Sequence, residues 1–408
     1  MKKALFIGLV WPEPRSSAAG WRMIQLVSLF QREYTVHFAS AATKTAYSHD
    51  LEEMGVVDHE IVLNDASFDD FVQELQPDVV VFDRFMVEEQ YGWRISANCP
   101  QAVRILDTED LHFLRSARVD AYRKNQPVNI YNDTALREIA AIYRSDLSLI
   151  ISEAEVQLLR TSFNLDDHLI HFLPFYEKPL TQEQILGKPS FDERKDFVFI
   201  GNFVHEPNWK TVEVLKRNIW PKLHRELPDT ELHIYGSYTP QKVNQLHDPK
   251  ERFLIKGRAD EARETLERYR VLLAPIPVGA GIKGKFVDAM YSGTPSISSS
   301  IGAEGMRKGE LWNGYVVDDD EEVVKQAKIL YTNKKEWLIA QQTGFEIFNT
   351  SFADIQYSQS FLRRCQELSE NLANHRNKNF MGRVLQHHTM QSTKYMSLWI
   401  AEKNKKAE

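Results

Sequence analysis

The sequence predicts an α/β protein with two doubly wound domains in series and a helical C-terminal extension. Short apolar runs that suit buried parallel strands alternate with helix-period segments along most of the 408 residues. Between Phe172 and Lys195 the alternation stops, because prolines, a glycine and charges break both periods. After Phe352 the pattern is helical and polar. The expected units are a first domain (1–173), a linker (174–195), a second domain (196–350) and C-terminal helices (351–408).

In the first domain, expected strands alternate with expected helices. Ala4–Val10 is a continuous apolar run, typical of a strand in a parallel sheet covered on both faces. Gly20–Gln31 follows with apolar residues at helical spacing. Further strands are expected at Thr35–Ala39, Ile61–Leu63, Val79–Phe82, Val103–Leu106 and Leu147–Ser152. Further helices are expected at Phe68–Leu75, Val87–Ala97, Asp110–Arg123, Asn132–Tyr143 and Glu153–Ser162.

The second domain repeats this alternation without a detectable sequence repeat. A single long helix is expected at Pro207–Arg225, since proline suits the first turn of a helix. Strands are expected at Phe197–Ile200, Leu232–Tyr235, Phe253–Ile255, Val271–Ala274 and Ser296–Ser298. Alternation of this kind predicts a second doubly wound sheet.

The most informative stretch of the second domain is a glycine turn between a strand and a helix. The apolar run Val271–Pro275 leads into Gly279–Gly281, and a helix-like segment follows. Such a turn offers unpaired backbone N–H groups and the positive end of a helix dipole, which suit an anion. Lys283 and Lys285 add positive charge for a diphosphate, and Asp288 adds a carboxylate for a sugar's vicinal hydroxyls. The spacing alone also fits an ordinary βαβ unit with solvated lysines.

The residues around this turn also match a family signature. The matching positions are Ala274, Pro275, Gly279–Lys283, Lys285, Ala289, Met290, Gly293, Pro295 and Gly302–Met306. This stretch resembles the donor-site signature of retaining glycosyltransferases of the GT-B fold (family 4-like, group 1). The resemblance is strong over Phe197–Val317, weaker over Met1–Leu173, and does not extend to the C-terminal tail.

The resemblance implies a fold and a reaction. GT-B proteins have two Rossmann-like domains facing a cleft, the first for the acceptor and the second for the nucleotide-sugar donor. Their last helix crosses back onto the first domain, as Phe352–Leu372 would do here. The implied enzyme moves a hexosyl or deoxyhexosyl group to a glycan or lipid-linked acceptor with retention and without a cofactor, in cell-surface polysaccharide biosynthesis. A non-catalytic GT-B-like module that binds a nucleotide sugar or a partner stays open, as does a nucleotide-sugar epimerase or hydrolase.

The resemblance also implies donor contacts, some of them at altered positions. The donor-binding candidates are Gly201, Asn202, Arg258, Gly281, Ile282, Lys283, Lys285, Asp288, Glu304, Gly305 and Met306. Asn202 and Asn208 stand where many members have an Arg and a Lys, which puts more weight on the two lysines after the glycine turn. Asp288 replaces a Glu, and Ala280 stands where an earlier Glu is common. Asn208 as a helix cap and a solvated Arg258 are the simpler interpretations.

A second group of candidates follows strands of the first domain, where ligands bind in open α/β sheets. Relatives place a His on the loop Asp107–His112, so the resemblance makes His112 a catalytic candidate together with Asp107 and Lys285. Arg22 is expected to project into the cleft from the first turn of its helix. The acceptor-binding candidates are Gly20, Arg22, Asp110 and Arg115. A structural His112 and a surface Arg22 are the alternatives.

Composition excludes several classes. The net charge of -7 gives no sign of nucleic-acid binding. Cys99 and Cys365 form no disulfide framework or metal motif, which fits a reducing compartment. No apolar run approaches the ~20 residues of a spanning helix, and the N-terminal run is too short for a signal peptide, so a cytoplasmic protein is expected. Asp318–Asp320 precedes a helix and is interpreted as a cap, and no metal site is predicted.

The C-terminal tail, Asn371–Glu408, mixes basic residues with apolar ones such as Phe380 and Trp399. One expectation is a helical appendage packed on the first domain. The other is peripheral contact with an anionic membrane, since each basic residue near such a surface contributes about 1 kcal/mol. The aromatic and Met content favours the packed alternative.

Overall fold

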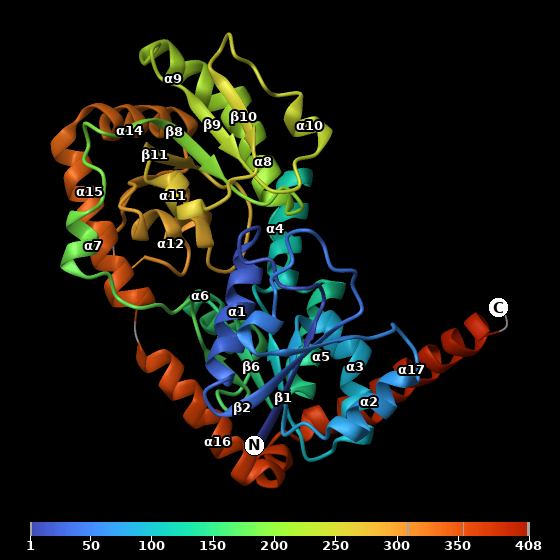
Figure 1. The fold of residues 1–408 in the computed structure, drawn as a ribbon. Helices are drawn as coiled ribbons and strands as arrows, with labels where there is room; N and C mark the ends of the chain where they lie inside the picture. Colours follow the sequence, from blue (N-terminus) through green and yellow to red (C-terminus); the bar gives the residue numbers. More distant parts are fainter. Residues whose placement is uncertain (1, 308, 310, 354, 406–408) are drawn as a thin grey trace.

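The computed structural model describes residues 2–307, 309, 311–353 and 355–405, without the side chains of 388–391. The end of the predicted tail, residues 406–408, lies outside the described residues. Two parallel sheets with surrounding helices form two domains, one above the other in Figure 1. The predicted α/β class with two Rossmann-like domains is confirmed.

The first sheet has the order β3-β2-β1-β4-β5-β6-β7, and its described strand pairs are parallel. Every residue of β4 and β5 is buried, including Arg104 within β5, and the apolar run that opens β4 predicts such burial. The strands are β1 (Lys2–Gly8), β2 (Tyr34–Ser40), β3 (Val57–Glu60), β4 (Val79–Asp83), β5 (Val103–Asp107), β6 (Leu147–Ile150) and β7 (Ile170–Phe172). The longer helices are α1 (Ala18–Phe30), α2 (Ser67–Leu75), α3 (Phe85–Asn98), α4 (His112–Lys124), α5 (Asp133–Arg144) and α6 (Glu153–Phe163), and η1 (Glu52–Met54) is a 3-10 turn.

The strand predicted at Ile61–Leu63 is wrong. The chain pairs with the sheet through β3, and Val62 and Leu63 point to solvent. Strand β3 lies at the edge of the sheet, and its sequence, Val-Asp-His-Glu, carries almost no apolar signal. The opposite edge strand, β7, which is only three residues long, was not predicted either.

The second sheet has the order β10-β9-β8-β11-β12-β13, again with parallel pairs. Its strands are β8 (Lys195–Ile200), β9 (Leu232–Tyr235), β10 (Phe253–Gly257), β11 (Tyr269–Ala274), β12 (Ser296–Ser298) and β13 (Gly314–Val316). Its helices are α8 (Glu206–Val214), α9 (Trp220–Glu226), α10 (Gln241–Asn244), α11 (Ala262–Leu266), α12 (Gly284–Tyr291), α13 (Ser300–Ala303), α14 (Asp320–Thr332) and α15 (Lys334–Ile347). Helix α7 (Gln182–Leu186) lies in the segment that joins the two sheets.

The single helix predicted at Pro207–Arg225 is interrupted. A π-helical segment, Leu215–Ile219, separates α8 from α9, and Pro221 lies in the first turn of α9. Proline has no N–H to donate to the preceding turn, so the backbone changes its hydrogen-bond register there.

The chain returns to the first domain at its C-terminal end, as the fold class predicted. After a second π-helical segment, Phe348–Phe352, α16 (Ile355–Lys378) runs back along the first domain, and α17 (Phe380–Lys405) follows it (Figure 1). The apolar face of α16 joins the core of the first domain through Phe361, Cys365, Leu368 and Leu372.

Candidate active site

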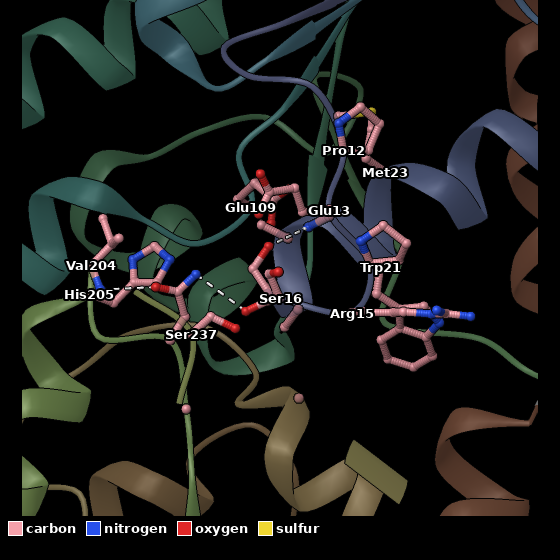
Figure 2. A pocket seen from close by; sticks show the side chains of 18 of the residues that line it. Pro12, Glu13, Arg15, Ser16, Trp21, Met23, Glu109, Val204, His205 and Ser237 are labelled. Carbon is pink, nitrogen blue, oxygen red and sulfur yellow. Dashed lines mark hydrogen bonds between the residues drawn. The ribbon is translucent and has the colours of Figure 1, made fainter. Parts of the chain in front are cut away.

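A large cleft lies between the carboxyl ends of the strands of the two sheets. Its volume is 1450 Å³. The first domain lines it with residues that follow β1, β4 and β5, and the second domain with residues that follow β8, β9, β10 and β11. Figure 2 shows Glu13, Ser16 and Glu109 of the first domain together with His205 and Ser237 of the second. This is the position at which open α/β sheets bind ligands.

Two lysines of the second domain form the basic wall of the cleft. Lys285 Nζ donates to Asn208 Oδ1 at 2.6 Å and lies 4.2 Å from the centre of the Phe199 ring. Lys283 Nζ donates to the carbonyl of Gly281 at 2.8 Å. Within the described residues, neither ammonium group has a carboxylate oxygen within ion-pair distance. The wall therefore holds two cations that a bound anion would neutralise.

Burial lowers the pKa of both lysines. For Lys285 the pKa falls to about 7, with a further contribution from the neighbouring cation Lys283. For Lys283 burial lowers the pKa to about 8, although Glu304 and Glu155 oppose the shift. Each lysine can therefore take up a proton when an anion binds beside it.

Asn208 has a role that its sequence position did not reveal. It lies in the first turn of α8, and its Nδ2 donates to the carbonyl of Asn202 at 2.7 Å while its Oδ1 binds Lys285. The position of Gly201 leaves room for this side chain, since a Cβ there would lie 2.7 Å from Asn208. The residue interpreted as a helix cap thus orients the lysine, while Asn202 lines the cleft and donates to the carbonyl of Ser16.

The other predicted cation and the predicted ribose contact also line the cleft, but both already have partners. Asp288 Oδ1 accepts from Arg263 Nε at 2.8 Å, and Arg263 also binds Glu177. Burial raises the pKa of Asp288, and Arg263 opposes that rise. The Arg258 guanidinium lies over the Tyr47 ring of the first domain at 4.4 Å. Both donor contacts stay predictions.

Two predicted donor residues lie at the interface between the domains instead of lining the cleft, and a third is buried in the core of the second domain. Glu304 forms a two-point ion pair with Arg118 of α4, at 2.6 and 2.7 Å. Gly305 packs so closely on the first domain that a Cβ there would lie 2.0 Å from Ser152 Oγ. Met306 is buried. In this arrangement the partners of Glu304 and Gly305 are residues of the first domain.

The backbone of the glycine turn is also occupied by the first domain. The N–H of Gly281 donates to Oε1 of Glu155 at 2.8 Å, and a Cβ at Gly281 would lie 2.7 Å from the Cβ of Asp110. Burial raises the pKa of Glu155 to about 8. Ile282 lines the cleft and its donor contact stays a prediction, whereas the amide expected to bind a phosphate faces Glu155. No local sequence pattern signals this contact, because the two residues are far apart in the chain.

On the first-domain wall, the structure brings together three of the predicted residues. His112 begins α4, and its Nδ1 lies 3.3 Å from Asp110 Oδ1. Asp110 also accepts two hydrogen bonds from Arg115, at 2.7 and 2.6 Å. Burial alone would raise the pKa of Asp110, but Arg115 and His112 hold it below its usual range. The side chains of all three line the cleft, and their catalytic and acceptor-binding roles stay predictions.

Asp107 and Arg22 do not face the cleft. Both are fully buried, at 0% and 1% exposure, and Arg22 donates to both carboxylate oxygens of Asp107 and to the carbonyl of Leu173. The expected projection of Arg22 into the cleft is therefore wrong, because its guanidinium neutralises a buried carboxylate instead. Gly20 lines the cleft, but the backbone it allows to approach is that of Glu13, 2.5 Å from where a Cβ would lie.

Several cleft residues were missed, among them Asp83, Arg84, Glu109 and His205. Burial lowers the pKa of His205 to about 4, and Arg115 adds to the effect. Asp83 is the last residue of β4, directly after an apolar run that was predicted as a strand. The end of β4 was therefore an available signal, but no candidate was sought in the loop that follows it.

The acidic stretch Asp318–Asp320 caps helices, as predicted. Asp319 accepts from the N–H groups of Glu321 and Glu322 at the start of α14, and Asp318 accepts from Ser300. Among the described residues, one group has metal-ligand composition and spacing: Asp196, Glu231 and His233. It lies at the amino ends of β8 and β9, away from the cleft, and Tyr269 already binds the His233 ring.

Comparisons with known proteins found a matching sequence family and solved structures with a similar fold. Residues 194–333 match the family model described as "Glycosyl transferases group 1". No curated protein sequence matches significantly. Among solved structures, sucrose-phosphate synthase from Thermosynechococcus elongatus aligns with a TM-score of 0.65 at 13% identity, over 90% of this chain and 99% of that one.

Two further solved structures are those of Anabaena HepE with UDP and glucose and of the pneumococcal O-GlcNAc transferase GtfA with UDP and GlcNAc. HepE aligns with a TM-score of 0.67 at 14% identity, over 89% of this chain and 99% of that one. GtfA aligns with a TM-score of 0.63 at 12% identity, over 90% and 99%. At these identities the likeness shows the fold. The chain thus has a GT-B fold, and residues 194–333 of its second domain match the glycosyltransferase group 1 family model.

Proposed function

We propose that the protein transfers a sugar from a nucleotide-diphosphate donor to an acceptor in the cleft between its domains. The observation that carries this proposal is the pair of half-buried lysines, Lys283 and Lys285, which face the cleft without a carboxylate partner among the described residues. The group 1 domain match and the UDP-bound complexes of HepE and GtfA support a nucleotide sugar as the ligand. In transfer, the lysines would stabilise the charge that develops on the leaving diphosphate.

The finer features of the reaction belong to the same proposal. The donor sugar is a hexose or deoxyhexose, the acceptor is a glycan or lipid-linked sugar of a cell-surface polysaccharide, and the anomeric configuration is retained. The signature around the glycine turn supports retention through front-face attack assisted by the leaving phosphate. Domain closure would exclude water and suppress donor hydrolysis.

Incubation with a panel of radiolabelled nucleotide sugars and glycan acceptors tests the proposal. A glycosylated product with the donor's anomeric configuration is the expected result. Binding without turnover would instead identify a non-catalytic module, an alternative that the Glu155 contact on the Gly281 amide favours. Release of free sugar or an epimerised nucleotide sugar would identify a hydrolase or an epimerase.

The lysines predict how nucleotide binding depends on pH. Both must be protonated to neutralise a diphosphate, and in the empty cleft their pKa values are about 7 and about 8. Above these pH values the lysines are neutral, so they must take up protons when the diphosphate binds. For each proton taken up, the affinity falls by as much as about tenfold with each rise of one pH unit. We expect UDP affinity, measured by calorimetry, to fall at least about tenfold from pH 7 to pH 9, with proton uptake visible in buffers of different ionisation enthalpy. A flat profile would contradict this assignment.

We also expect activity to persist in EDTA. Two lysines at the helix N-terminus can supply the charge that a divalent cation supplies in other transferases. The check is the initial transfer rate before and after chelation, with added Mg²⁺ or Mn²⁺ as the control. Abolition by EDTA and recovery with metal would overturn the prediction.

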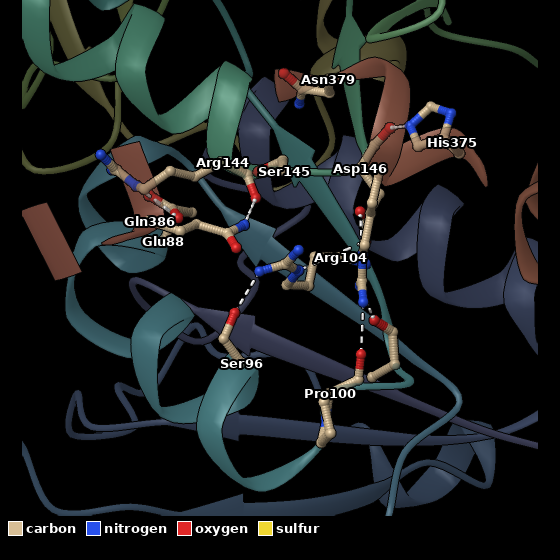
Figure 3. A network of polar contacts seen from close by, with 12 residues as sticks. Glu88, Ser96, Pro100, Arg104, Arg144, Ser145, Asp146, His375, Asn379 and Gln386 are labelled. Atoms are coloured by element: carbon tan, nitrogen blue, oxygen red, sulfur yellow. Dashed lines mark hydrogen bonds and ion pairs between the residues drawn. The ribbon is translucent and has the colours of Figure 1, made fainter. Parts of the chain in front are cut away.

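The first part of the tail is held on the first domain by a polar network around Asp146 (Figure 3). Arg376 donates to both carboxylate oxygens of Asp146 at 2.7 Å, and His375 binds its carbonyl. Further along, Asn379 and Gln386 bind the carbonyls of Tyr143 and Arg144 at the end of α5. This part of the tail is therefore packed on the body of the protein.

The second part of the tail presents apolar and basic side chains to solvent. The exposed apolar residues there are Tyr395, Met396, Leu398 and Trp399, and Lys394, Lys403 and Lys405 lie on the same helix. None of the described helices combines the length and apolar character that spanning a membrane requires. Peripheral contact of this part with an anionic membrane belongs to the proposal, since aromatic and basic residues together suit a membrane interface.

A further inference from the structure

Two carboxylates that line the cleft, Asp83 and Glu109, lie at or just after the ends of the neighbouring strands β4 and β5 of the first sheet. Asp83 is the last residue of β4 and lies opposite Asp107, the last residue of β5, in the strand register. Glu109 follows two residues later, and both Asp83 and Glu109 line the cleft. Unlike Asp107, which the Arg22 guanidinium neutralises, they face the space between the domains.

Both carboxylates hold a buried oxygen without a partner. Asp83 is only 4% exposed; its Oδ2 accepts from the N–H of Leu9 at 3.0 Å, and its Oδ1 has no hydrogen-bond partner among the described residues. Oε1 of Glu109 is likewise buried and unpartnered within the described chain. Buried acceptors without donors are rare because they are costly, so these two oxygens call for donors that a ligand would supply.

The backbone that presents these groups is strained. Arg84, directly after Asp83, has φ 74° and ψ 159°, a region that residues other than glycine rarely enter. Glu109 has φ 64°, in the left-handed region. Strain of this kind persists where function requires a particular side-chain direction.

The charges around the pair indicate which ligand it suits. Arg84 Nη1 lies 3.6 Å from Asp83 Oδ2 and Arg115 is bound to Asp110, so the nearest cleft-facing cations of this wall are already engaged. The unpartnered carboxyl oxygens can accept from O–H donors, and the engaged arginines leave this wall little positive charge to attract a phosphate. The two lysines of the basic wall belong to the second domain, across the cleft.

We propose that Asp83 and Glu109 form the acceptor subsite and bind the hydroxyl groups of a neutral carbohydrate. The proposal rests on the proposed function and deepens it by assigning the acceptor's chemistry to one wall of the cleft. Burial and the nearby Asp107 and Asp83 raise the pKa of Glu109 to about 8, against the opposing charges of Arg84 and Arg22. A neutral Glu109 can both donate to and accept from a hydroxyl group.

The test measures the binding of methyl and p-nitrophenyl glycosides to the full chain by saturation-transfer NMR, with UDP present to fill the donor side. Glu109→Met, which keeps the length of the side chain but removes both carboxyl oxygens, and Asp83→Asn should each weaken the binding of the glycoside that wild type prefers by about tenfold, while UDP affinity stays unchanged. Glu153→Gln, at an exposed carboxylate at the start of α6, is the matched control. Equal glycoside binding by wild type and both variants, or selective binding of glucose 1-phosphate through the same residues, would overturn the proposal.

Glu109→Gly separates binding from structure. Glycine adopts the left-handed region without strain, so this variant should melt at a higher temperature than wild type while losing glycoside binding. A lower melting temperature would mean that Glu109 stabilises the fold, and the subsite proposal would fall. Failure of wild type to bind any nucleotide would instead refute the proposed function, so the two failures are distinguishable.

Discussion

Replacing Lys285 by alanine should weaken UDP binding at pH 7 by about 10- to 100-fold and lower kcat/KM for transfer by a similar factor. A hydrogen bond to a charged group contributes about 1.5–3 kcal/mol, and about 1.4 kcal/mol corresponds to a factor of ten. Lys285 meets the requirements for such a contact, since it faces the cleft and Asn208 fixes its ammonium group. Calorimetry with UDP and initial-rate kinetics are the measurements.

Companion variants sharpen this experiment. Lys285→Met keeps the packing on Phe199 but not the charge, so it should bind UDP as poorly as the alanine variant. The melting temperature of Lys285→Met should not fall at pH 7. Folding lowers the pKa of Lys285 from 10.5 to about 7, so burying the protonated lysine disfavours the folded state at pH 7. This cost disappears only as the pH rises from about 7 to 10.5, and the methionine variant does not have it. Lys210→Ala, on the same helix as Asn208 but paired with Glu213, is the control and should leave binding unchanged. Wild-type affinity in Lys285→Ala would remove the lysine from the site.

Ending the chain at Leu372 should lower the melting temperature by about 10 °C. The truncation removes Arg376 and His375 from Asp146, which is almost completely buried. Removing one partner of a buried ion pair costs about 3–5 kcal/mol, and each kcal/mol shifts the melting temperature of a domain of this size by about 2–4 °C. Differential scanning calorimetry is the measurement.

A second truncation, ending at Ser392, separates the two parts of the tail. It keeps Gln386 and the network around Asp146, so its melting temperature should stay within about 2 °C of that of the full chain, since surface changes away from such features have small effects. If the proposed membrane contact holds, only the full chain should sediment with vesicles that contain phosphatidylserine. An unchanged melting temperature after truncation at Leu372 would contradict the structural role of the network.

The architecture was predictable because strand and helix signals are local. Apolar runs such as Val79–Phe82 of β4 and Val271–Ala274 of β11 suit strands that are buried on both faces, and they indicated a parallel sheet in each domain. The signal failed at the edges, where β3 is polar, and within the helix interrupted before Pro221. Elements at sheet edges need only one partner, so their sequences carry less pattern.

The sequence could indicate which residues lie near the candidate site, but not which residues they bind. Spacing drew attention to Lys283 and Lys285, and the family resemblance to His112; all three follow strand ends and line the cleft, although their roles stay predictions. Spacing does not tell which way a side chain points at the start of a helix, so Arg22 was expected in the cleft although it neutralises Asp107 in the interior. Contacts between distant segments, such as Asn208 with Lys285, depend on how the strands are ordered in the folded sheet.

The hydrogen bond from the Gly281 amide to Glu155 joins the second domain to the first. The affinity of any ligand that needs this amide therefore depends on how often the two domains separate at this point. A phosphate that uses this amide can bind only where Glu155 has withdrawn, and withdrawal separates the glycine turn from the first domain. The measured dissociation constant is then the intrinsic constant divided by the fraction of molecules already open. If the proposed donor uses this amide, its affinity depends in part on Glu155, whose carboxylate occupies the amide in this arrangement.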